Sequence, residues 1–249
     1  MKVLITGASR GIGFEIFNQL LVEGNELVVH CNKNTKKIQD LIRDKDHSVW
    51  VFKSDLSKND GVKGLVEFTK MKLKFPDVII NNAGIAESSP VELNYNKWLE
   101  MFDKTINVNL KSPAMICKEF IALKRKNKIN KRLRIINISS RAAFRGEVED
   151  FISYACSKGG LVALTKTISR SFGKTDNVLA FTIAPGFVNT DMASDFISEH
   201  GEGIAKKGIV LDRLTEPKDI APIVSFIANG KIDHSTGSTI DVNGGSYLR

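Results

Sequence analysis

The sequence predicts an α/β protein built on one doubly wound parallel β-sheet of about seven strands, with helices on both faces. Two observations lead to this fold class. Short apolar runs alternate with helical patterns along the whole chain, as in proteins whose parallel strands are joined by helices. The apolar runs are continuous, which indicates strands buried on both faces. No proline- or serine-rich linker divides the chain, so we expect one domain over residues 1–249.

The expected elements follow the chain in order. Residues 2–6 form an apolar strand that runs directly into a glycine-rich turn, and the next helix carries Ile12, Ile16 and Leu20 on one stripe. Further strands are expected at 26–31, 48–52, 77–81, 133–138, 178–183 and 239–242. Helices are expected at 36–43, 60–74, 95–126, 153–172 and 219–228, with 95–126 as one long helical region.

The stretch MKVLITGASRGIGF at residues 1–14 has the features of a phosphate-binding turn. Its glycines allow tight turning and a close approach of the backbone to a ligand. The free N–H groups and the dipole of the following helix favour an anion. The glycine spacing is G-x-x-x-G-x-G, whereas the commonest dinucleotide fingerprint is G-x-G-x-x-G. By itself, this turn predicts only an environment that suits a phosphate group.

The composition is that of an ordinary soluble globular protein, for which we expect a cytoplasmic location. The chain is 42% hydrophobic and 26% charged, and no apolar run approaches the ~20 residues that cross a bilayer. Glycines end the N-terminal apolar stretch too early for a signal peptide. Three widely spaced cysteines and four scattered histidines match no disulfide or metal-site spacing, so no metal is expected.

The net charge of +8 raises the question of an acidic partner. Basic residues concentrate at 124–128 and 131–134. Because no aromatic stacking set or nucleic-acid motif accompanies them, we expect a solvated helix end and loop and no nucleic-acid binding. An acidic protein or a phosphorylated substrate handle docking there is the alternative.

In a doubly wound sheet, ligands bind outside the carboxyl ends of the strands. The polar and glycine residues that directly follow the expected strands therefore mark the site. They are residues 7–13, 31–33, Asp55, 81–84, Ser139, Ser140, Pro185 and Gly186. Their gathering at one edge favours a functional site over ordinary turns.

A tyrosine and a lysine four residues apart stand near the start of the helix expected at 153–172. Residues at this spacing share a helix face, with Cβ atoms roughly 5–6 Å apart. An ammonium near a phenol favours the phenolate, so Lys158 is expected to lower the pKa of Tyr154 from about 10 towards neutrality. Tyr154 would then serve as a general acid or base near neutral pH.

A set of motifs carries a resemblance over the whole chain. Its members are Thr6-Gly7-x-x-x-Gly11-x-Gly13, Asn81-Asn82-Ala83-Gly84, Asn109, Ser140, Tyr154-x-x-x-Lys158, and Pro185-Gly186 with Thr190. In order and approximate spacing they resemble the short-chain dehydrogenase/reductases, which have a Rossmann-type fold. Residues 184–192 and 213–221 resemble the 3-oxoacyl-[acyl-carrier-protein] reductase branch.

The resemblance implies four catalytic residues. Tyr154 would donate a proton to a carbonyl oxygen as hydride arrives at its carbon, and Ser140 would polarise that carbonyl. Lys158 would lower the pKa of Tyr154 and bind the nicotinamide ribose. Asn109 would hold the water that links Lys158 to solvent. Asn107 and Ser139 are nearby decoys for Asn109 and Ser140.

The resemblance also implies a cofactor site. The pyrophosphate, adenosine, nicotinamide ribose and carboxamide would be held by Gly7, Ser9, Arg10, Gly11, Ile12, Gly13, Asn32, Asp55, Leu56, Asn82, Ala83, Gly84, Tyr154, Lys158, Pro185, Gly186, Val188 and Thr190. NAD enzymes place an acid after the second strand to bind the ribose 2′-hydroxyl, but this chain has Cys31-Asn32-Lys33 there. Arg10 could pair with a 2′-phosphate, so NADPH is favoured over NADH.

Three further expectations concern the surroundings of the site. Residues at about 191–211 resemble the family's mobile substrate lid. Cys156 is interpreted as a small buried hydrophobe. The acids Glu147, Glu149 and Asp150 either disfavour a carboxylate-bearing substrate or form a solvated loop.

The expected function is therefore that of an NADPH-dependent ketoreductase, specifically a 3-oxoacyl-[acyl-carrier-protein] reductase of fatty-acid or polyketide-type synthesis. Lys131, Arg132 and Lys174 would lie near the face on which the acidic carrier docks. One alternative is a dehydrogenase of a sugar, secondary alcohol or other tailoring substrate. Another is a non-catalytic dinucleotide-binding regulator, against which the four catalytic residues argue. The resemblance implies a homotetramer, or a homodimer, with residues 244–249 at a subunit contact.

Overall fold

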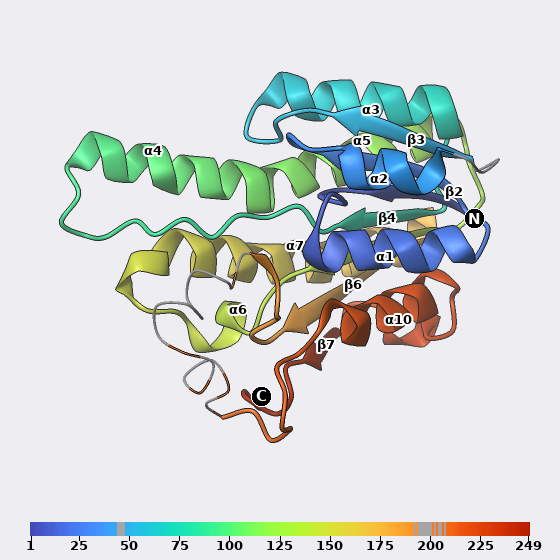
Figure 1. The fold of residues 1–249 in the computed structure, drawn as a ribbon. Helices are drawn as coiled ribbons and strands as arrows, with labels where there is room; N and C mark the ends of the chain where they lie inside the picture. The colour runs from blue at the N-terminus through green and yellow to red at the C-terminus, as the bar shows by residue number, and fades with distance from the viewer. Residues whose placement is uncertain (44–47, 192, 194–200, 202, 204–205, 207) are drawn as a thin grey trace.

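A single parallel sheet organises the chain, as Figure 1 shows for the computed structural model. The structure describes residues 1–43, 48–191, 193, 201, 203, 206 and 208–249. Within them, seven strands lie in the order β3-β2-β1-β4-β5-β6-β7, and every neighbouring pair is parallel. The predicted fold class, a doubly wound Rossmann-type sheet, is confirmed.

The observed elements agree closely with the expected ranges. The strands are β1 (Lys2–Ile5), β2 (Glu26–Cys31), β3 (Val49–Lys53), β4 (Val78–Asn81), β5 (Leu133–Ile138), β6 (Val178–Pro185) and β7 (Thr239–Val242). The helices are α1 (Gly11–Val22), α2 (Lys36–Ile42), α3 (Asn59–Leu73), α4 (Tyr95–Ile106), α5 (Ser112–Lys126), α6 (Ala142–Arg145), α7 (Ile152–Asp176) and α10 (Pro217–Ala228). Short 3₁₀ turns cover Glu149–Phe151 and Asp233–Ser235.

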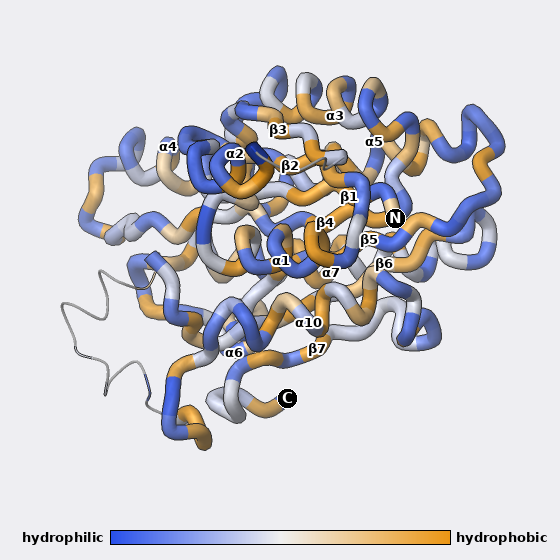
Figure 2. The backbone as a smooth tube through the Cα atoms, turned by 45° about the vertical axis from the view of Figure 1, so that its right-hand side comes forward, coloured by the Kyte–Doolittle hydropathy of each residue, from blue (hydrophilic) through white to orange (hydrophobic). Residues whose placement is uncertain are grey.

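Two hydrophobic cores lie on opposite faces of the sheet. On one face, α1, α2 and α10 pack against alternate strand residues such as Ile5, Val29 and Ile136. On the other face, α3, α5 and α7 pack against the intervening residues, such as Leu4 and Ile135. Figure 2 shows the hydrophobic segments gathered along the central strands and the hydrophilic ones on the outer turns. Burial on both faces explains why the strands are apolar runs without alternation.

The strand order reverses between β1 and β4. The chain leaves β1 toward α1 on one face, whereas the connections after β4 lead to α5 on the other face. Such a switch point leaves a crevice at the carboxyl ends of the two strands, where open α/β sheets bind ligands. The turn after β1 and the residues after β4 are therefore the structural centre of the candidate site.

The prediction of one continuous helix at 95–126 is wrong. A π-helical turn at Asn107–Lys111 separates α4 from α5. Pro113 has no N–H with which to bond the carbonyl of Asn109 in an α-helix, which favours a wider turn at this point. Turns of this kind often occur at functional sites, and Asn109 is one of the predicted catalytic residues.

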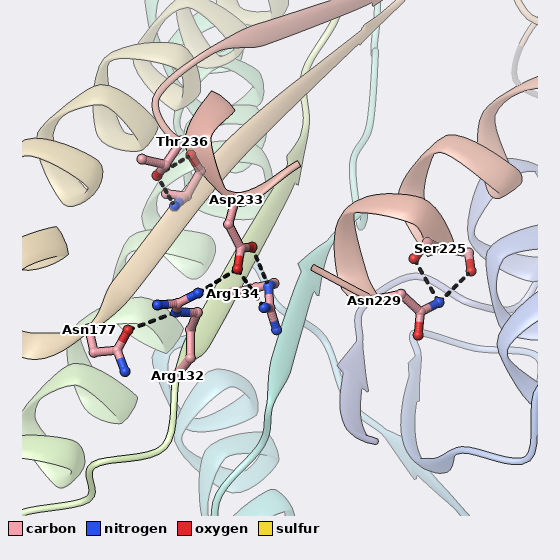
Figure 3. A network of polar contacts seen from close by, with 8 residues as sticks. Arg132, Arg134, Asn177, Ser225, Asn229, Asp233 and Thr236 are labelled. Carbon is pink, nitrogen blue, oxygen red and sulfur yellow. Dashed lines mark hydrogen bonds and ion pairs between the residues drawn. The ribbon is translucent and has the colours of Figure 1, made fainter. Parts of the chain in front are cut away.

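A charged network ties the amino-terminal edge of the sheet together (Figure 3). Arg134 at the start of β5 donates two hydrogen bonds to Asp233, at 2.7 and 2.8 Å. Arg132 donates to Asp233 at 2.5 Å and to Asn177 at 2.8 Å. The arginines thus join β5 to the connection before β7 and to the end of α7. The positively charged guanidinium groups of Arg134 and Arg132 hold the pKa of Asp233 below its usual range, and Arg134 contributes most.

In the described part of the chain, none of the helices combines the length and the apolar character that crossing a bilayer requires.

The apolar face of α1 provides a test of the packing. Phe17 is fully buried between α1 and the sheet, whereas Val22 on the same helix is 81% exposed. Phe17→Ala should lower the free energy of unfolding by about 3–5 kcal/mol, because it removes buried contacts and leaves a cavity. Val22→Ala should change it by less than about 0.5 kcal/mol. Urea unfolding followed by circular dichroism measures both, and similar losses in the two variants would contradict this packing.

Candidate active site

The glycine-rich turn packs directly against the end of β4. Gly7 has a φ of +69°, and a Cβ atom there would lie 2.7 Å from the Cα of Ala83. A Cβ on Gly13 would lie 2.2 Å from the Gly7 carbonyl oxygen. Neither position has room for a side chain, so glycine is required at both. Ser9, Gly11 and Ile12 are partly exposed along the turn.

Side chains from β1 and β4 hold this turn in place. Asn82 donates from Nδ2 to the carbonyls of Thr6, at 3.0 Å, and Gly7, at 2.9 Å. Thr6 Oγ1 accepts from the N–H groups of Asn82 and Ala83, both at 3.0 Å. The Asn82 side chain is thus committed to the turn. Thr6 had no predicted role in the site beyond its place in the glycine-rich motif.

The beginning of α1 suits an anionic ligand. Arg10 is the N-cap residue, and no side chain caps the helix. The first turn holds no acidic residue. Uncapped N–H groups at a helix N-terminus attract phosphate, so the pyrophosphate of a dinucleotide fits the groups present here.

Residues after β6 reach the same turn from the other side. The Thr190 Cγ2 atom lies 3.2 Å from the position that a Cβ on Gly11 would take. Arg10 forms an exposed ion pair with Asp191 at 3.7 Å. Val188 is buried. Pro185 is the last residue of β6, and Gly186 follows it. A Cβ atom on Gly186 would lie 2.8 Å from the Cα of Asn243, so the two residues are in close contact.

The predicted adenine-side residues follow the ends of β2 and β3. Asn32 is exposed directly after β2, and Asp55 is exposed just beyond β3. The N–H of Ser54 donates to the carbonyl of Cys31 at 3.1 Å, which keeps the two segments adjacent. The Leu56 side chain is buried in a core cluster, so only the backbone of Leu56 could contact a nucleotide.

The catalytic candidates meet where β5 and α7 pack together. Tyr154 hydrogen bonds with Ser140, and the Lys158 Nζ lies 5.7 Å from the centre of the Tyr154 ring. Lys158 is 4% exposed, and its Nζ donates to the carbonyl of Ile138 at 2.8 Å. A Cβ on Gly84 would lie 3.3 Å from that Nζ. The end of β4 therefore lies against the predicted catalytic lysine.

Asn109 clamps the loop after β4. Its Oδ1 accepts from the N–H of Ile85 at 2.8 Å, and its Nδ2 donates to the Ile85 carbonyl at 2.8 Å. The same Nδ2 donates to Ser157 at 3.0 Å. Asn109 is fully buried, whereas the decoy Asn107 is partly exposed. Ser157 is a residue that sequence reasoning missed, because only the fold brings it to Asn109.

The decoy Ser139 has a packing role of its own. Its hydroxyl donates to the carbonyl of Lys158 at 2.9 Å, which fixes α7 against the end of β5.

The expectation that Tyr154 has a lowered pKa is wrong for this structure. Removal from water raises the pKa of the phenol; the hydrogen bond with Ser140 opposes this, and the negative charge of Glu147 adds to the rise. Lys158 is itself affected, since burial disfavours its ammonium form and lowers its pKa to about 8. The groups that shift the pKa of the phenol are thus its buried surroundings, Ser140 and Glu147, and not Lys158.

The acidic loop between Ser140 and Tyr154 is held by hydrogen bonds and an ion pair. Glu147 forms an ion pair with Arg145 at 2.5 Å. Asp150 accepts from the Ser88 hydroxyl at 2.8 Å, and its backbone carbonyl accepts from the Ser89 N–H at 2.8 Å. The loop is thereby attached to the segment after β4, directly before α7.

Two other expectations differ from the structure. Cys156 is exposed, not buried, because its direction around α7 falls at the edge of the buried face that Ser153, Ser157 and Lys158 form. Lys131 and Arg132 are at the amino-terminal edge of the sheet, paired with Asp77 and Asp233, and not beside the catalytic edge.

Most of the lid expected at 191–211 lies outside the described residues, which include only 191, 193, 201, 203, 206 and 208–211 of it.

Comparisons with known proteins identify the family of the chain. A short-chain dehydrogenase/reductase family model described as enoyl-(acyl carrier protein) reductase matches residues 7–247. The chain belongs to the short-chain dehydrogenase/reductase family. Its members are NAD(P)-dependent oxidoreductases, and this chain is one of them.

Among curated relatives, the 3-oxoacyl-[acyl-carrier-protein] reductase of Rickettsia conorii is 33% identical over 245 residues, covering 98% of this chain and 96% of the relative. A solved structure of 4-hydroxyisoleucine dehydrogenase complexed with NADH is 29% identical, with a TM-score of 0.86, covering 98% of this chain and 97% of the other. A 3-ketoacyl-(acyl-carrier-protein) reductase from Brucella melitensis shares the fold at 24% identity, with a TM-score of 0.85, covering 99% and 98% of the two chains.

The buried lysine of this short-chain dehydrogenase/reductase makes stability depend on pH. Its pKa is about 8 in the folded protein and near 10.5 when exposed. Between these two pH values the lysine is protonated in the unfolded state and largely neutral in the folded state, so folding must release its proton. The free energy that this release costs becomes smaller as the pH rises. Relative to Lys158→Met, the wild type should therefore gain about 1–2 kcal/mol of unfolding free energy between pH 7.5 and 9.5. Urea unfolding at both pH values measures this, and a difference independent of pH would contradict a buried ammonium.

Proposed function

We propose that this chain is an NADPH-dependent ketoreductase that reduces a 3-oxoacyl thioester carried by an acyl carrier protein. The observation that carries the reaction type is the contact of Tyr154 with Ser140 beside the buried Lys158, at the sheet edge where α1 begins uncapped. A non-catalytic regulator would not need this combination of groups.

The side chains divide the chemistry among them. The bound nicotinamide cofactor supplies the hydride. Ser140 holds the carbonyl oxygen and stabilises the negative charge that develops on it. Tyr154 donates its proton to that oxygen, and its raised pKa keeps the phenol protonated at neutral pH, which suits a general acid in the direction of reduction. Lys158 binds the nicotinamide ribose, and Asn109 keeps the segment after β4 against it.

Two relatives support two candidate substrates. The reductase from Rickettsia conorii, 33% identical over nearly the full length of both chains, supports an acyl-carrier-bound 3-oxoacyl group. The likeness to 4-hydroxyisoleucine dehydrogenase supports a small hydroxy amino acid as the second candidate. Glu147, whose negative charge acts on Tyr154, favours a substrate without a free carboxylate.

NADPH is the proposed cofactor because no acid follows β2. The exposed residues there are Asn32 and Lys33, and neither supplies the carboxylate with which NAD enzymes bind the ribose 2′-hydroxyl. Arg10 is exposed in the turn after β1, and its ion pair with Asp191 is of a kind worth only ~0–1 kcal/mol. Its guanidinium can therefore exchange that partner for a 2′-phosphate.

We also propose a homotetramer that works in the cytoplasm. Exposed apolar side chains on α4, such as Tyr95 and Leu99, and Leu248 near the C-terminus support contacts between copies of the chain.

Replacing the proposed acid tests the reaction type. Tyr154→Phe removes the proton donor and should lower kcat for acetoacetyl thioester reduction by about 10²–10⁴-fold, while the Kd for NADPH stays within about twofold because the phenyl ring keeps its packing. Tyr95→Phe, at a tyrosine 77% exposed on α4, is the matched control and should retain wild-type rates. Wild-type activity in the Tyr154→Phe variant would refute the assignment.

Substrate choice is tested on the wild type. Initial rates with carrier-bound acetoacetate, the free thioester and, in the oxidative direction, 4-hydroxyisoleucine should rank the carrier-bound thioester first. No turnover with any of the three would exclude both candidate substrates.

Cofactor choice depends on Arg10. The wild type should show a higher kcat/KM with NADPH than with NADH. Arg10→Ala should lower the NADPH value about tenfold or more, since a charge-assisted pair with phosphate is lost, and leave the NADH value nearly unchanged. Arg43→Ala, which removes an exposed arginine paired with Asp40 on α2, is the control. Equal or better use of NADH by the wild type would show that the proposed preference is wrong.

A further inference from the structure

A buried histidine lies between the glycine-rich turn and the end of β3. His30, the last residue but one of β2, is 2% exposed. The N–H of Gly7 donates to its Nδ1 at 3.3 Å. On the other side of the ring, Nε2 bonds to the carbonyl of Ser54 at 2.9 Å. The imidazole thus joins the expected pyrophosphate turn to the segment that leads to Asp55.

The partners determine the protonation state of the ring. A peptide N–H can only donate, so Nδ1 must offer its lone pair to Gly7. A carbonyl can only accept, so Nε2 must carry the proton. The neutral Nε2–H tautomer satisfies both contacts. The imidazolium does not, because its Nδ1–H would point at the N–H of Gly7 with no acceptor between them.

Both backbone polar groups of Gly7, its N–H and its carbonyl, form hydrogen bonds with side chains. His30 accepts its N–H, and Asn82 donates to its carbonyl at 2.9 Å. The backbone carbonyl of His30 also accepts from the N–H of Ala8 at 3.0 Å. Because Gly7 adopts a positive φ at the start of the turn, loss of the ring contact removes one of the few restraints on its conformation.

The surroundings of the ring favour its neutral form. Burial lowers the pKa of His30, against an opposing hydrogen bond with Ser54 and the charge of Asp55. The ring contacts the Ser54 carbonyl on the side of β3 and the N–H of Gly7 on the side of the turn after β1. In the described part of the chain, Asp55 is the one charged side chain whose field acts on it.

We propose that His30 is a positioning residue for the cofactor site, which in its neutral Nε2–H form ties the pyrophosphate turn to the adenine-side segment and releases the turn when protonated. The inference rests on the proposed dinucleotide binding and adds a residue that contacts neither the cofactor nor the substrate. It gives the enzyme a cofactor affinity that falls at acid pH.

Two substitutions separate the two contacts of the ring. In His30→Asn, Oδ1 stands near the place of Nδ1 and can accept from Gly7 without titrating. In His30→Gln, the amide reaches toward the Ser54 carbonyl and leaves Gly7 without its acceptor. We expect His30→Gln to weaken the binding of NADPH and of NADH about fivefold or more at pH 7.5, as for loss of one buried hydrogen bond, and His30→Asn to weaken it less. The kcat at saturating cofactor should change less than twofold in both.

The decisive measurement is the Kd of both nucleotides, by cofactor fluorescence, from pH 7.5 down to about pH 5, because burial moves the titration of His30 to more acid pH. The wild-type affinity should fall with pH, for NADH as well as for NADPH, whose 2′-phosphate takes up a proton in this range. The His30→Asn variant should lose this acid dependence for NADH.

Two results would overturn the inference and leave the proposed function standing. One is an identical pH profile in the wild type and in His30→Asn. The other is an equal loss of affinity in His30→Asn and His30→Gln at pH 7.5. Failure of the wild type to bind either nucleotide at any pH would overturn both the inference and the proposed function.

Discussion

The turn between β1 and α1 approaches the end of β4 so closely that no Cβ atom fits at Gly7 or Gly13, and the candidate site depends on this contact. It brings together the two strands at which the sheet order reverses. Asn82 holds the turn from the β4 side, and the amides of α1 are left without a side-chain cap. The anion site therefore results from backbone packing, and residues with larger side chains would separate the two strands.

The proposed catalytic groups depend on a second contact, between α7 and the end of β5. Ser139 bonds to the backbone of Lys158, and the Lys158 ammonium bonds to the backbone of Ile138. These bonds bury the lysine and hold Tyr154 against Ser140. Burial lowers the pKa of the ammonium and raises that of the phenol, so the site stores its proton on the tyrosine. The proposed reduction of a carbonyl needs the proton in this place.

Much of the fold could be predicted from the pattern of the residues, because strand burial and helix periodicity are local consequences of one sheet covered on both faces. The errors have physical causes. Asn109 and Pro113 interrupt a helix that periodicity alone would continue, since the missing N–H of proline acts on a carbonyl four residues earlier. Cys156 is apolar enough for a core, yet its angle around α7 turns it to solvent. The rise in the pKa of Tyr154 depends on burial, which spacing along a helix does not report.

By itself, the sequence determined which chemical groups are available and at which edge of the sheet they gather: the spacing of Gly7, Gly11 and Gly13, the Tyr154–Lys158 pair, and the absence of an acid after the second strand. The tertiary structure decided how those groups act on one another. It placed Ser157 on Asn109, His30 on Gly7, and the basic residues 131 and 132 at the opposite edge. Hydrogen bonds and desolvation act over a few ångströms in space, so residues distant in sequence set the charge and position of each catalytic group.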